Sequence, residues 1–196
     1  MNRIAIFASG NGSNAQKIAE YFSNINLAKV TMILSNNPDA FVLHRARQFG
    51  VATKVFDRKQ FYHSEEVLRC LKENKIDLIV LAGFLWLIPD YLIRSYPKKI
   101  INIHPALLPK YGGKGMYGDA VHKAVISAGE SESGITIHYV NKDYDKGEVI
   151  FQARCKIQEN DTAEVLAERI HNLEYQHYPK VIEAILTDVP YPTKTG

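Results

Sequence analysis

Apolar runs alternate along the first half of the chain with stretches in which apolar residues recur every three or four positions. The short runs predict β-strands and the longer period predicts helices. Strands are expected at 3–8, 29–35, 51–56, 77–83 and 99–104, and helices near 14–24, 40–49, 60–74 and 85–96. The runs IAIF and LIVLA lack polar alternation, which is typical of strands buried on both faces. The alternation of strands and helices predicts right-handed βαβ units and a parallel sheet.

The pattern changes after residue 104. A glycine-rich stretch over 111–118 predicts a loop, and a helix is expected over about 119–128. The segments 134–140 and 147–157 are longer strand-like runs joined by NKDYDKG, which predicts an antiparallel pair.

A final helix is expected from about Thr162 to Leu186, with Asp161 as its N-cap. Pro179 is expected to kink or break this helix because proline has no N–H to donate. The tail from Pro190 is expected to be loose.

The predicted fold class is α/β, with a Rossmann-like parallel-sheet core, helices on both faces and an antiparallel C-terminal portion. The chain has no repeat and no linker-like segment. We therefore expect a single domain over 1–196, with an N-terminal half of about 1–100 and a C-terminal half of about 101–190.

The charge, the cysteines and the apolar runs of the chain limit the binding partners that we expect. The net charge is +3 and no Lys/Arg block is present, so we expect no nucleic-acid partner, and one anionic ligand accounts for this balance. Cys70 and Cys155 do not have the sequence spacing of metal-ligand pairs, and we interpret both as free thiols in a reducing compartment. No apolar run approaches the roughly 20 residues of a membrane span, and the N-terminus is too polar for a signal peptide. These features predict a cytoplasmic protein with no membrane partner.

The first candidate site is the stretch ASGNGSNA between the first expected strand and the first expected helix. Gly10, Gly12 and Ala15 satisfy G-x-G-x-x-A, the dinucleotide-binding fingerprint. That fingerprint also expects an acidic residue at the end of the second strand, where this chain reads SNNPD. A single phosphate at the helix N-terminus is therefore favoured over both a pyrophosphate and a plain turn, with Ser13 and Asn14 adding donors.

The second candidate is the pair Asn102 and His104, at the end of the fifth expected strand. Residues two apart in a strand point to the same side, and sites in α/β sheets lie at the carboxyl ends of strands. A lone histidine would be interpreted as a satisfied core residue. An amide and an imidazole aimed at one point can instead donate to an oxygen that develops negative charge.

Two other stretches are ambiguous from the residues alone. Asp145 lies in a polar segment that favours a solvated hairpin turn, and His138 on the strand before it is more typical of a structural residue. The aromatic and aliphatic residues of 81–89 fit either a core segment, which is the safer interpretation, or the wall of a pocket for a flat ring.

These pieces occur in a known order. The sequence resembles the glycinamide ribonucleotide formyltransferases, folate-dependent enzymes of purine (IMP) synthesis within the formyltransferase fold family. The resemblance spans nearly the whole chain and rests on SGNGSN (9–14), LAGF (81–84), NIHPALLPKY (102–111), GITIHYV (134–140), DYDKGEVI (143–150) and EYQHYP (174–179).

The resemblance implies transfer of a formyl group from 10-formyltetrahydrofolate, as cosubstrate, to the amine of glycinamide ribonucleotide (GAR), with no metal and in a monomer or homodimer. It implies a phosphate-binding N-terminal half and a catalytic and folate-binding C-terminal half. The implied catalytic residues are Asn102, His104 and Asp145, with Asp145 raising the pKa of His104 and the first two donating to the oxyanion. The implied GAR-binding residues are Gly10, Asn11, Gly12, Ser13, Asn14 and Glu174. The implied folate-binding residues are Lys59, Phe84, Leu85, Trp86, Leu87, Ile88, Asn102, Val140 and Asp145.

Family members also commonly have a cis bond at the position of Leu108–Pro109. This chain departs from the family at Trp86, where many members have Arg beside the pteridine, and in a longer loop over 111–122 that can act as a lid. Lys59 lies near a position where relatives often carry an Arg that binds the folate tail.

Rival functions remain open. A formyltransferase of the same fold acting on a sugar-nucleotide or aminoacyl-tRNA amine usually carries an extra C-terminal domain, and a formyltetrahydrofolate hydrolase usually carries an N-terminal one. A non-catalytic nucleotide-binding module would use the glycine loop alone and would give no reason for Asn102, His104 and Asp145 to converge.

Overall fold

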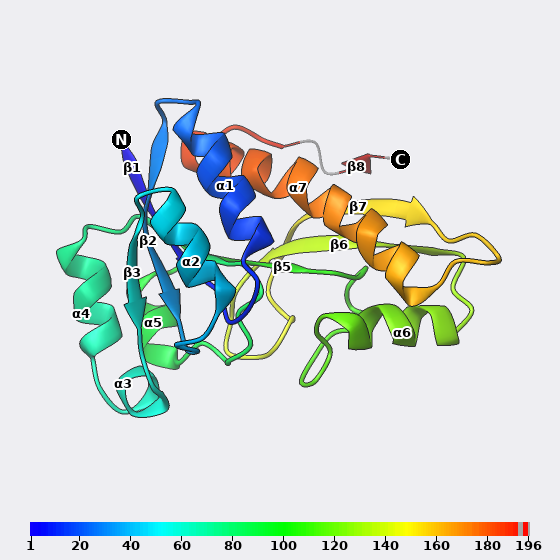
Figure 1. The fold of residues 1–196 in the computed structure, drawn as a ribbon, viewed down its shortest axis with the longest axis horizontal. Helices are drawn as coiled ribbons and strands as arrows, with labels where there is room; N and C mark the ends of the chain where they lie inside the picture. The colour runs from blue at the N-terminus through cyan, green and yellow to red at the C-terminus, as the bar shows by residue number, and fades with distance from the viewer. Residues whose placement is uncertain (192–193, 196) are drawn as a thin grey trace. The chain divides into compact units, whose positions relative to one another are not determined.

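The structure is a computed structural model that describes residues 1–191, 194 and 195 (Figure 1). The chain divides into two compact units, Met1–Ile101 and Asn102–Gly196. None of the helices in the described part of the chain is long and apolar enough to cross a membrane.

The first unit is built from parallel β-strands joined by helices. Its elements are β1 (Asn2–Phe7), α1 (Ser13–Ser23), β2 (Ala28–Ser35), α2 (Phe41–Gln48), β3 (Ala52–Val55), α3 (Arg58–Tyr62), α4 (Glu66–Glu73), β4 (Leu78–Leu81) and α5 (Asp90–Ser95). The strand order is β3-β2-β1-β4, and every pair in it is parallel. Helices α1 and α2 cover one face, and α4 and α5 cover the other (Figure 1).

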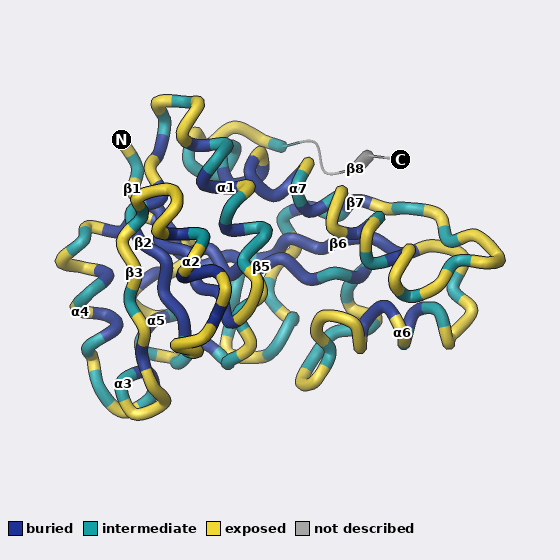
Figure 2. Tube along the Cα trace, in the orientation of Figure 1, coloured by how far each residue is buried: buried dark blue, intermediate teal, exposed yellow. Residues whose placement is uncertain are grey.

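The centre of this unit lies along β1. Ile4, Ile6 and Phe7 are fully buried, and β2 and β4 flank them with apolar residues, whereas the edge strand β3 is exposed (Figure 2). The absence of alternation in IAIF and LIVLA therefore has the predicted cause, since both strands are covered on both faces.

Two helices of this unit differ from the sequence prediction. Residues 60–74 form α3 and α4 rather than one helix. At the break the hydroxyl of Ser64 donates to the carbonyl of Gln60 and accepts from the N–H of Glu66, which ends one helix and starts the next. The helix expected over 85–96 contains only Asp90–Ser95. Pro89, with ψ of 150°, is its N-cap, and residues 84–88 form an irregular aromatic segment instead.

The second unit contains β5 (Ile100–His104), which starts just before the boundary, and α6 (Asp119–Ser127), β6 (Glu132–Tyr139), β7 (Val149–Lys156), α7 (Ala163–Thr187) and β8 (Lys194–Thr195). β6 and β7 are antiparallel, as predicted. Helix α7 packs on β6, β7 and α6. The predicted fold class, with a parallel core, helices on both faces and an antiparallel C-terminal portion, is confirmed.

The structure differs from the expectations for the C-terminal segment at three places. The N-cap of α7 is Thr162, whose side chain accepts from the Val165 N–H, while Asp161 pairs with Arg169. The helix does not break at Pro179, because buried side chains on both sides of it hold the helix on the sheet. After Pro190, Lys194 and Thr195 form β8, which pairs with β7 in parallel. The other residues that the tail expectation covered include 192, 193 and 196, which lie outside the described part of the chain.

Gly12, at the start of α1, is the glycine on which the loop of the first unit depends. Its φ is +76°, a conformation that residues with a Cβ rarely adopt. A Cβ built there would lie 2.2 Å from Cγ2 of Val42 and 2.9 Å from its Cα. The loop and α2 therefore approach each other more closely than any other residue at this position would allow.

We expect Gly12→Ala to lower the free energy of unfolding by about 2–4 kcal/mol, through backbone strain and overlap with Val42. Gly10→Ala is the matched control, because a Cβ there meets nothing within 4 Å and its φ is not positive. Urea unfolding of both variants measures the difference. Equal stabilities would contradict this account of the loop.

Candidate active site

The second unit gathers the predicted polar residues at the end of β5. Asn102 and His104 point to the same side of the strand, and Asp145 reaches them from the turn between β6 and β7. Nδ1 of His104 lies 3.6 Å from Oδ2 of Asp145, and Nδ2 of Asn102 lies 3.4 Å from Oδ1 of Asp145. The structure thus brings together three side chains that lie up to 43 positions apart in the sequence.

His138 belongs to the same cluster, although the sequence favoured a structural role for it. Its Nε2 lies 3.6 Å from Oδ1 of Asp145 and 3.2 Å from Nδ2 of Asn102. The sequence contained a signal for this, because Thr136 and His138 are two positions apart among the apolar residues of 135–137, with the same spacing as Asn102 and His104.

The loop after β5 closes over this cluster. The carbonyl oxygen of Tyr111 lies 2.7 Å from Nε2 of His104, and the N–H of Gly113 donates to Oδ2 of Asp145 at 2.9 Å. Outside the cluster, the hydroxyl of Tyr111 donates to Glu130 at 2.8 Å, as does the ammonium of Lys110. Residues 110–113, which we call the strap, therefore hold both members of the His–Asp pair.

These contacts define where the protons lie. A carbonyl oxygen only accepts, so Nε2 of His104 carries a hydrogen and donates to Tyr111. In neutral His104 the lone pair on Nδ1 then faces the carboxylate of Asp145, and protonation of Nδ1 converts this contact into an ion pair. The same reasoning places the hydrogen of His138 on Nδ1, which donates to the carbonyl of Tyr139, and lets Nε2 accept from Asn102.

Burial sets the charge states. His104 is 3% exposed, and burial lowers its pKa more than Asp145 and the Tyr111 carbonyl raise it. The contribution of Asp145 to the pKa of His104 has the expected sign, but burial outweighs it and the net shift is downward. Burial alone would raise the pKa of Asp145, but His138, His104 and the Gly113 N–H together lower it. The site thus holds an ionised carboxylate beside an imidazole that gains a proton reluctantly.

The turn that carries Asp145 is tightly constrained. Asp145 has a φ of +55°, and a Cβ on Gly147 would lie 1.5 Å from the carbonyl oxygen of Tyr139. The side chain of Asn141 spans the turn and donates to the carbonyl of Lys146 at 2.9 Å. The segment is a hairpin turn with exposed residues such as Lys142 and Asp143, as the local sequence favoured, but the side chain of Asp145 itself is turned into the polar cluster and is 11% exposed.

The residues implied for other roles in this unit are placed as follows. Glu174 lies on α7 and is 6% exposed, and Val140 follows β6 directly. Leu108–Pro109 is cis, as the resemblance implied. A cavity of about 230 Å³ lies beside the strap, lined by Tyr111, Glu130, Gln152 and Arg154 among others, but it contains none of the polar cluster. The described residues include no group of three or more side chains suited to hold a metal ion.

In the first unit, the glycine loop runs directly into α1. Gly12 is the N-cap of α1, and no side chain forms a capping hydrogen bond there. The first turn of the helix contains no acidic residue. The hydroxyl of Ser9 donates to Oδ1 of Asn36 at 2.6 Å, so an amide occupies the place where a dinucleotide site expects a carboxylate. The exposed N–H groups of a helix start with no nearby acid suit a single anion.

Arg45 of α2 was not recognised from the sequence. Its guanidinium donates to the carbonyl oxygen of Asn11 at 2.9 Å and to the side-chain oxygen of Asn11 at 2.6 Å, and it also bonds to Gln16. It therefore places a positive charge beside the glycine loop. Only the packing of α2 against the loop, where the Val42 N–H donates to the carbonyl of Gly10, brings it there.

The segment 84–88 of the first unit is an exposed edge of an aromatic cluster. Phe84 and Trp86 are half-buried and pack with Phe56 and Phe61, Leu85 is 42% exposed and Ile88 is buried. The guanidinium of Arg58 lies 4.9 Å from the centre of the Trp86 ring. The neighbouring Lys59 is exposed. Ile88 belongs to the core, whereas Leu85 is exposed and can contact a ligand. The segment is therefore neither purely a core segment nor purely the wall of a pocket.

Comparison with known proteins agrees with this architecture. Residues 2–182 match the family model described as formyl transferase. A phosphoribosylglycinamide formyltransferase of Bacillus subtilis is 38% identical over 191 residues, covering 95% of both chains. A chloroplastic phosphoribosylglycinamide formyltransferase of Arabidopsis thaliana is 41% identical over 189 residues. The chain spans less than two thirds of the chloroplastic relatives, 65% of the Arabidopsis protein and 60% of that from Vigna unguiculata.

Solved structures give the same result. The crystal structure of phosphoribosylglycinamide formyltransferase from Anaplasma phagocytophilum superposes with a TM-score of 0.88 at 36% identity, covering 95% of this chain and 87% of that one. The structure from Streptococcus pneumoniae gives 0.83 at 38% identity, covering 94% and 99%. With a family model that matches most of its length and relatives that align nearly end to end, this chain belongs to the formyl transferase family.

Proposed function

We propose that the protein transfers the formyl group of 10-formyltetrahydrofolate to the primary amine of GAR, which gives formylglycinamide ribonucleotide and tetrahydrofolate. The observation that carries this proposal is the buried pairing of His104 with Asp145 beside Asn102. Relatives named phosphoribosylglycinamide formyltransferase, some of them matched along nearly their whole length, support the choice of acceptor.

In the proposed reaction the amine nitrogen attacks the formyl carbon, and the carbonyl electrons move onto oxygen to give a tetrahedral intermediate. Collapse of this intermediate breaks the bond between the formyl carbon and N10, and the proton lost by the amine ends on N10. Asp145, ionised and 11% exposed at its side chain, accepts the proton from the amine directly or through one water. Most of the rate enhancement comes from holding the amine against the formyl carbon.

The oxyanion needs donors, and here the strap enters the proposal. Nε2 of His104 already donates to the Tyr111 carbonyl, and Nδ2 of Asn102 is within reach of His138 and Asp145. We assign the position of the Tyr111 carbonyl oxygen to the intermediate's oxygen, which replaces it when the substrates bind. The strap therefore shifts during each turnover, and the loop after it acts as part of a lid.

In the first unit, the phosphate of GAR binds at the start of α1 among the residues Gly10, Asn11, Gly12, Ser13 and Asn14, with the backbone N–H groups of the last three as donors. In the second unit, Glu174 contacts GAR. The folate contacts are assigned to Lys59, Phe84, Leu85, Trp86, Leu87, Ile88, Asn102, Val140 and Asp145. The protein is proposed to work in the cytoplasm, as a monomer or homodimer.

One assay separates this proposal from its rivals. Release of tetrahydrofolate is measured with GAR, with a sugar-nucleotide amine and with no amine. Release that depends on GAR supports the proposal. Release without any amine indicates a hydrolase, and release only with the sugar nucleotide indicates a different acceptor.

Asp145→Asn is expected to lower kcat by roughly 10²–10⁴-fold, because it removes a positioned proton acceptor while keeping the shape of the side chain. The negative charge of Asp145 raises the pKa of His104, so its loss lowers that pKa further. The limb of the pH–rate profile that His104 contributes should therefore move to lower pH. The losses in kcat of Asp145→Asn and His104→Ala should be strongly non-additive in the double variant, because the two residues act as one unit. Near-wild-type turnover in Asp145→Asn would remove the basis of the mechanism.

Arg45→Met is expected to raise the KM for GAR about tenfold and to leave the KM for the formyl donor unchanged. The guanidinium both orients Asn11 in the glycine loop and places a charge beside the phosphate. Arg47→Met is the matched control, since it removes the same charge from the same helix at an exposed position. A similar KM for GAR in both variants, or a change in the KM for the donor, would contradict the phosphate assignment.

Trp86 offers an optical test of the folate assignment, because it is the only tryptophan in the chain. Its fluorescence is expected to change when a folate analogue binds, since a pteridine ring that stacks nearby alters its surroundings. GAR alone should leave the spectrum unchanged. An unaltered spectrum at a saturating analogue concentration, with binding verified by calorimetry, would place Trp86 outside the folate site.

A further inference from the structure

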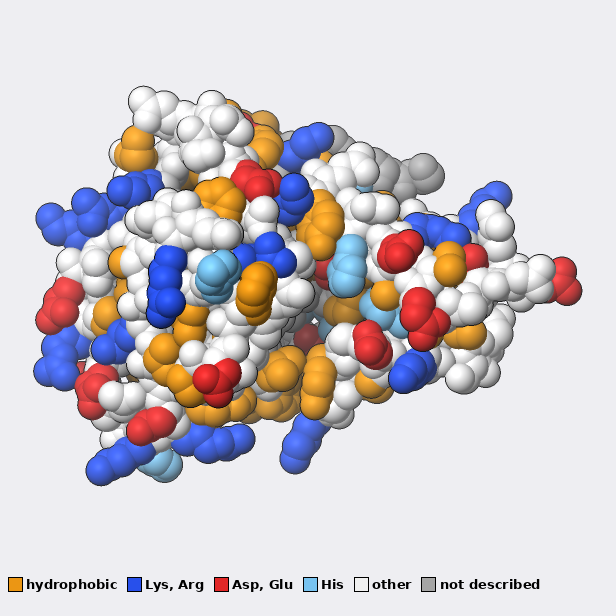
Figure 3. Space-filling model, in the orientation of Figure 1, with side chains coloured by type: hydrophobic (Ala, Val, Ile, Leu, Met, Phe, Trp, Pro, Cys, Tyr) orange, Lys and Arg blue, Asp and Glu red, His pale blue; other side chains and the backbone are white. Residues whose placement is uncertain are grey.

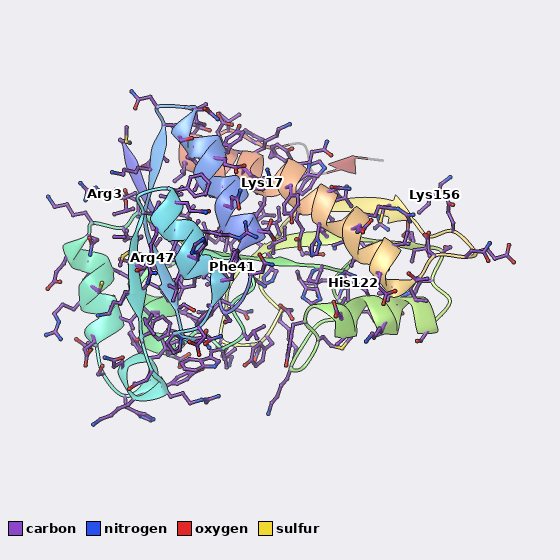
Figure 4. All side chains as sticks on the ribbon, viewed as in Figure 1. Arg3, Lys17, Phe41, Arg47, His122 and Lys156 are labelled. Atoms are coloured by element: carbon purple, nitrogen blue, oxygen red, sulfur yellow. The ribbon has the colours of Figure 1, made fainter. Side chains whose placement is uncertain are left out.

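His122 on α6 is a buried histidine whose Nδ1 has no hydrogen-bond partner among the described residues. It is 2% exposed, and its Nδ1 is fully buried. In Figure 4 its side chain lies on the side of α6 that faces α7. The neighbouring buried residues of α6, Val121 and Val125, are apolar. Buried polar atoms are rarely left unpaired, so this one calls for an explanation.

The surroundings of His122 are polar where α6 meets α7. His171 of α7 and His104 of the polar cluster are both near enough to lower its pKa, and Asp119, at the start of α6, acts in the opposite direction. His171 and Glu174 are three residues apart on α7 and so lie on one side of that helix. Histidine and acidic side chains gather over α6 and α7 on the face shown in Figure 3. His122 is therefore part of a polar patch between these helices.

The charge state of His122 restricts what it can bind. Burial lowers its pKa most, and His171 lowers it further. A neutral imidazole has one donor and one acceptor, which a phosphate or an ammonium group can satisfy only in part. A hydroxyl group donates and accepts, so it can pair with either nitrogen. GAR carries two ribose hydroxyls, and Glu174, the residue assigned to GAR, lies on α7, which packs on α6.

We infer that His122 is a further substrate-contacting residue, whose ring hydrogen-bonds to a ribose hydroxyl of GAR between α6 and α7. This inference rests on the proposed function for the identity of the ligand. It gives the unpaired imidazole a partner, and it places the sugar near His104, where the amine of the same molecule must react.

A purely structural histidine would behave differently. Exchanging an unpaired buried imidazole for an aromatic ring of similar volume is neutral or stabilising, because no hydrogen bond is lost. His122→Phe is therefore expected to keep or raise the melting temperature. The same variant is expected to raise both the KM and the calorimetric Kd for GAR about tenfold, because the substrate hydroxyl loses its partner. The KM for the formyl donor should not change.

The experiment is completed by changing the ligand. Wild type and His122→Phe are compared on GAR, 2′-deoxy-GAR and 3′-deoxy-GAR, and His122→Gln serves as the conservative variant. We expect the tenfold difference to disappear with one of the deoxy substrates and His122→Gln to recover part of it. A folded His122→Phe enzyme with wild-type affinity for GAR overturns the inference, as does a difference that persists with both deoxy substrates. If the wild-type enzyme fails to formylate GAR at all, it is the proposed function that falls.

Discussion

The carboxylate of Asp145 is the group around which the polar centre of the second unit is organised. It is nearly buried, so its charge has to be compensated by hydrogen bonds and by polar neighbours. One amide and one backbone N–H donate to it, two imidazole nitrogens lie 3.6 Å away, and these groups come from β5, from β6 and from the strap. The positions of His104, His138 and Asn102 relative to one another are thus defined by their shared contact with a single anion.

The strap, residues 110–113, holds the polar cluster in place from outside the strands. It supplies the carbonyl that fixes the tautomer of His104 and the N–H that binds Asp145, and its outer end is tied to Glu130. The contacts within the cluster are long, between 3.2 and 3.6 Å, whereas the contact between His104 and the strap is 2.7 Å. The polar centre is therefore held in place mainly from the strap, and movement of the strap changes which groups the imidazole can reach.

The sequence was sufficient wherever the signal is local or periodic. The parallel strands followed from apolar runs, and Asn102 with His104 followed from a spacing of two. The break between α3 and α4 was missed because it depends on the hydroxyl of one residue, Ser64. The irregular segment 84–88 was missed because its aromatic residues pack with Phe56 and Phe61 rather than in a helix. Arg45 and His122 carry no local signal at all, since each acquires its neighbours only when one helix packs on another element.

The turn from Asp145 to Gly147 limits how this protein can change through evolution. Position 147 tolerates no side chain, because a Cβ would overlap the Tyr139 carbonyl, and position 145 requires a left-handed backbone as well as a carboxylate. A substitution at 147 is therefore selected against by geometry alone, and one at 145 by both geometry and charge. Lys142 and Asp143, only a few residues earlier, are exposed and carry neither constraint. Sequence drift in descendants of this chain should accordingly be concentrated at positions 142 and 143. A lineage that adopts a different acceptor or loses activity should show its first changes at positions 145 and 147.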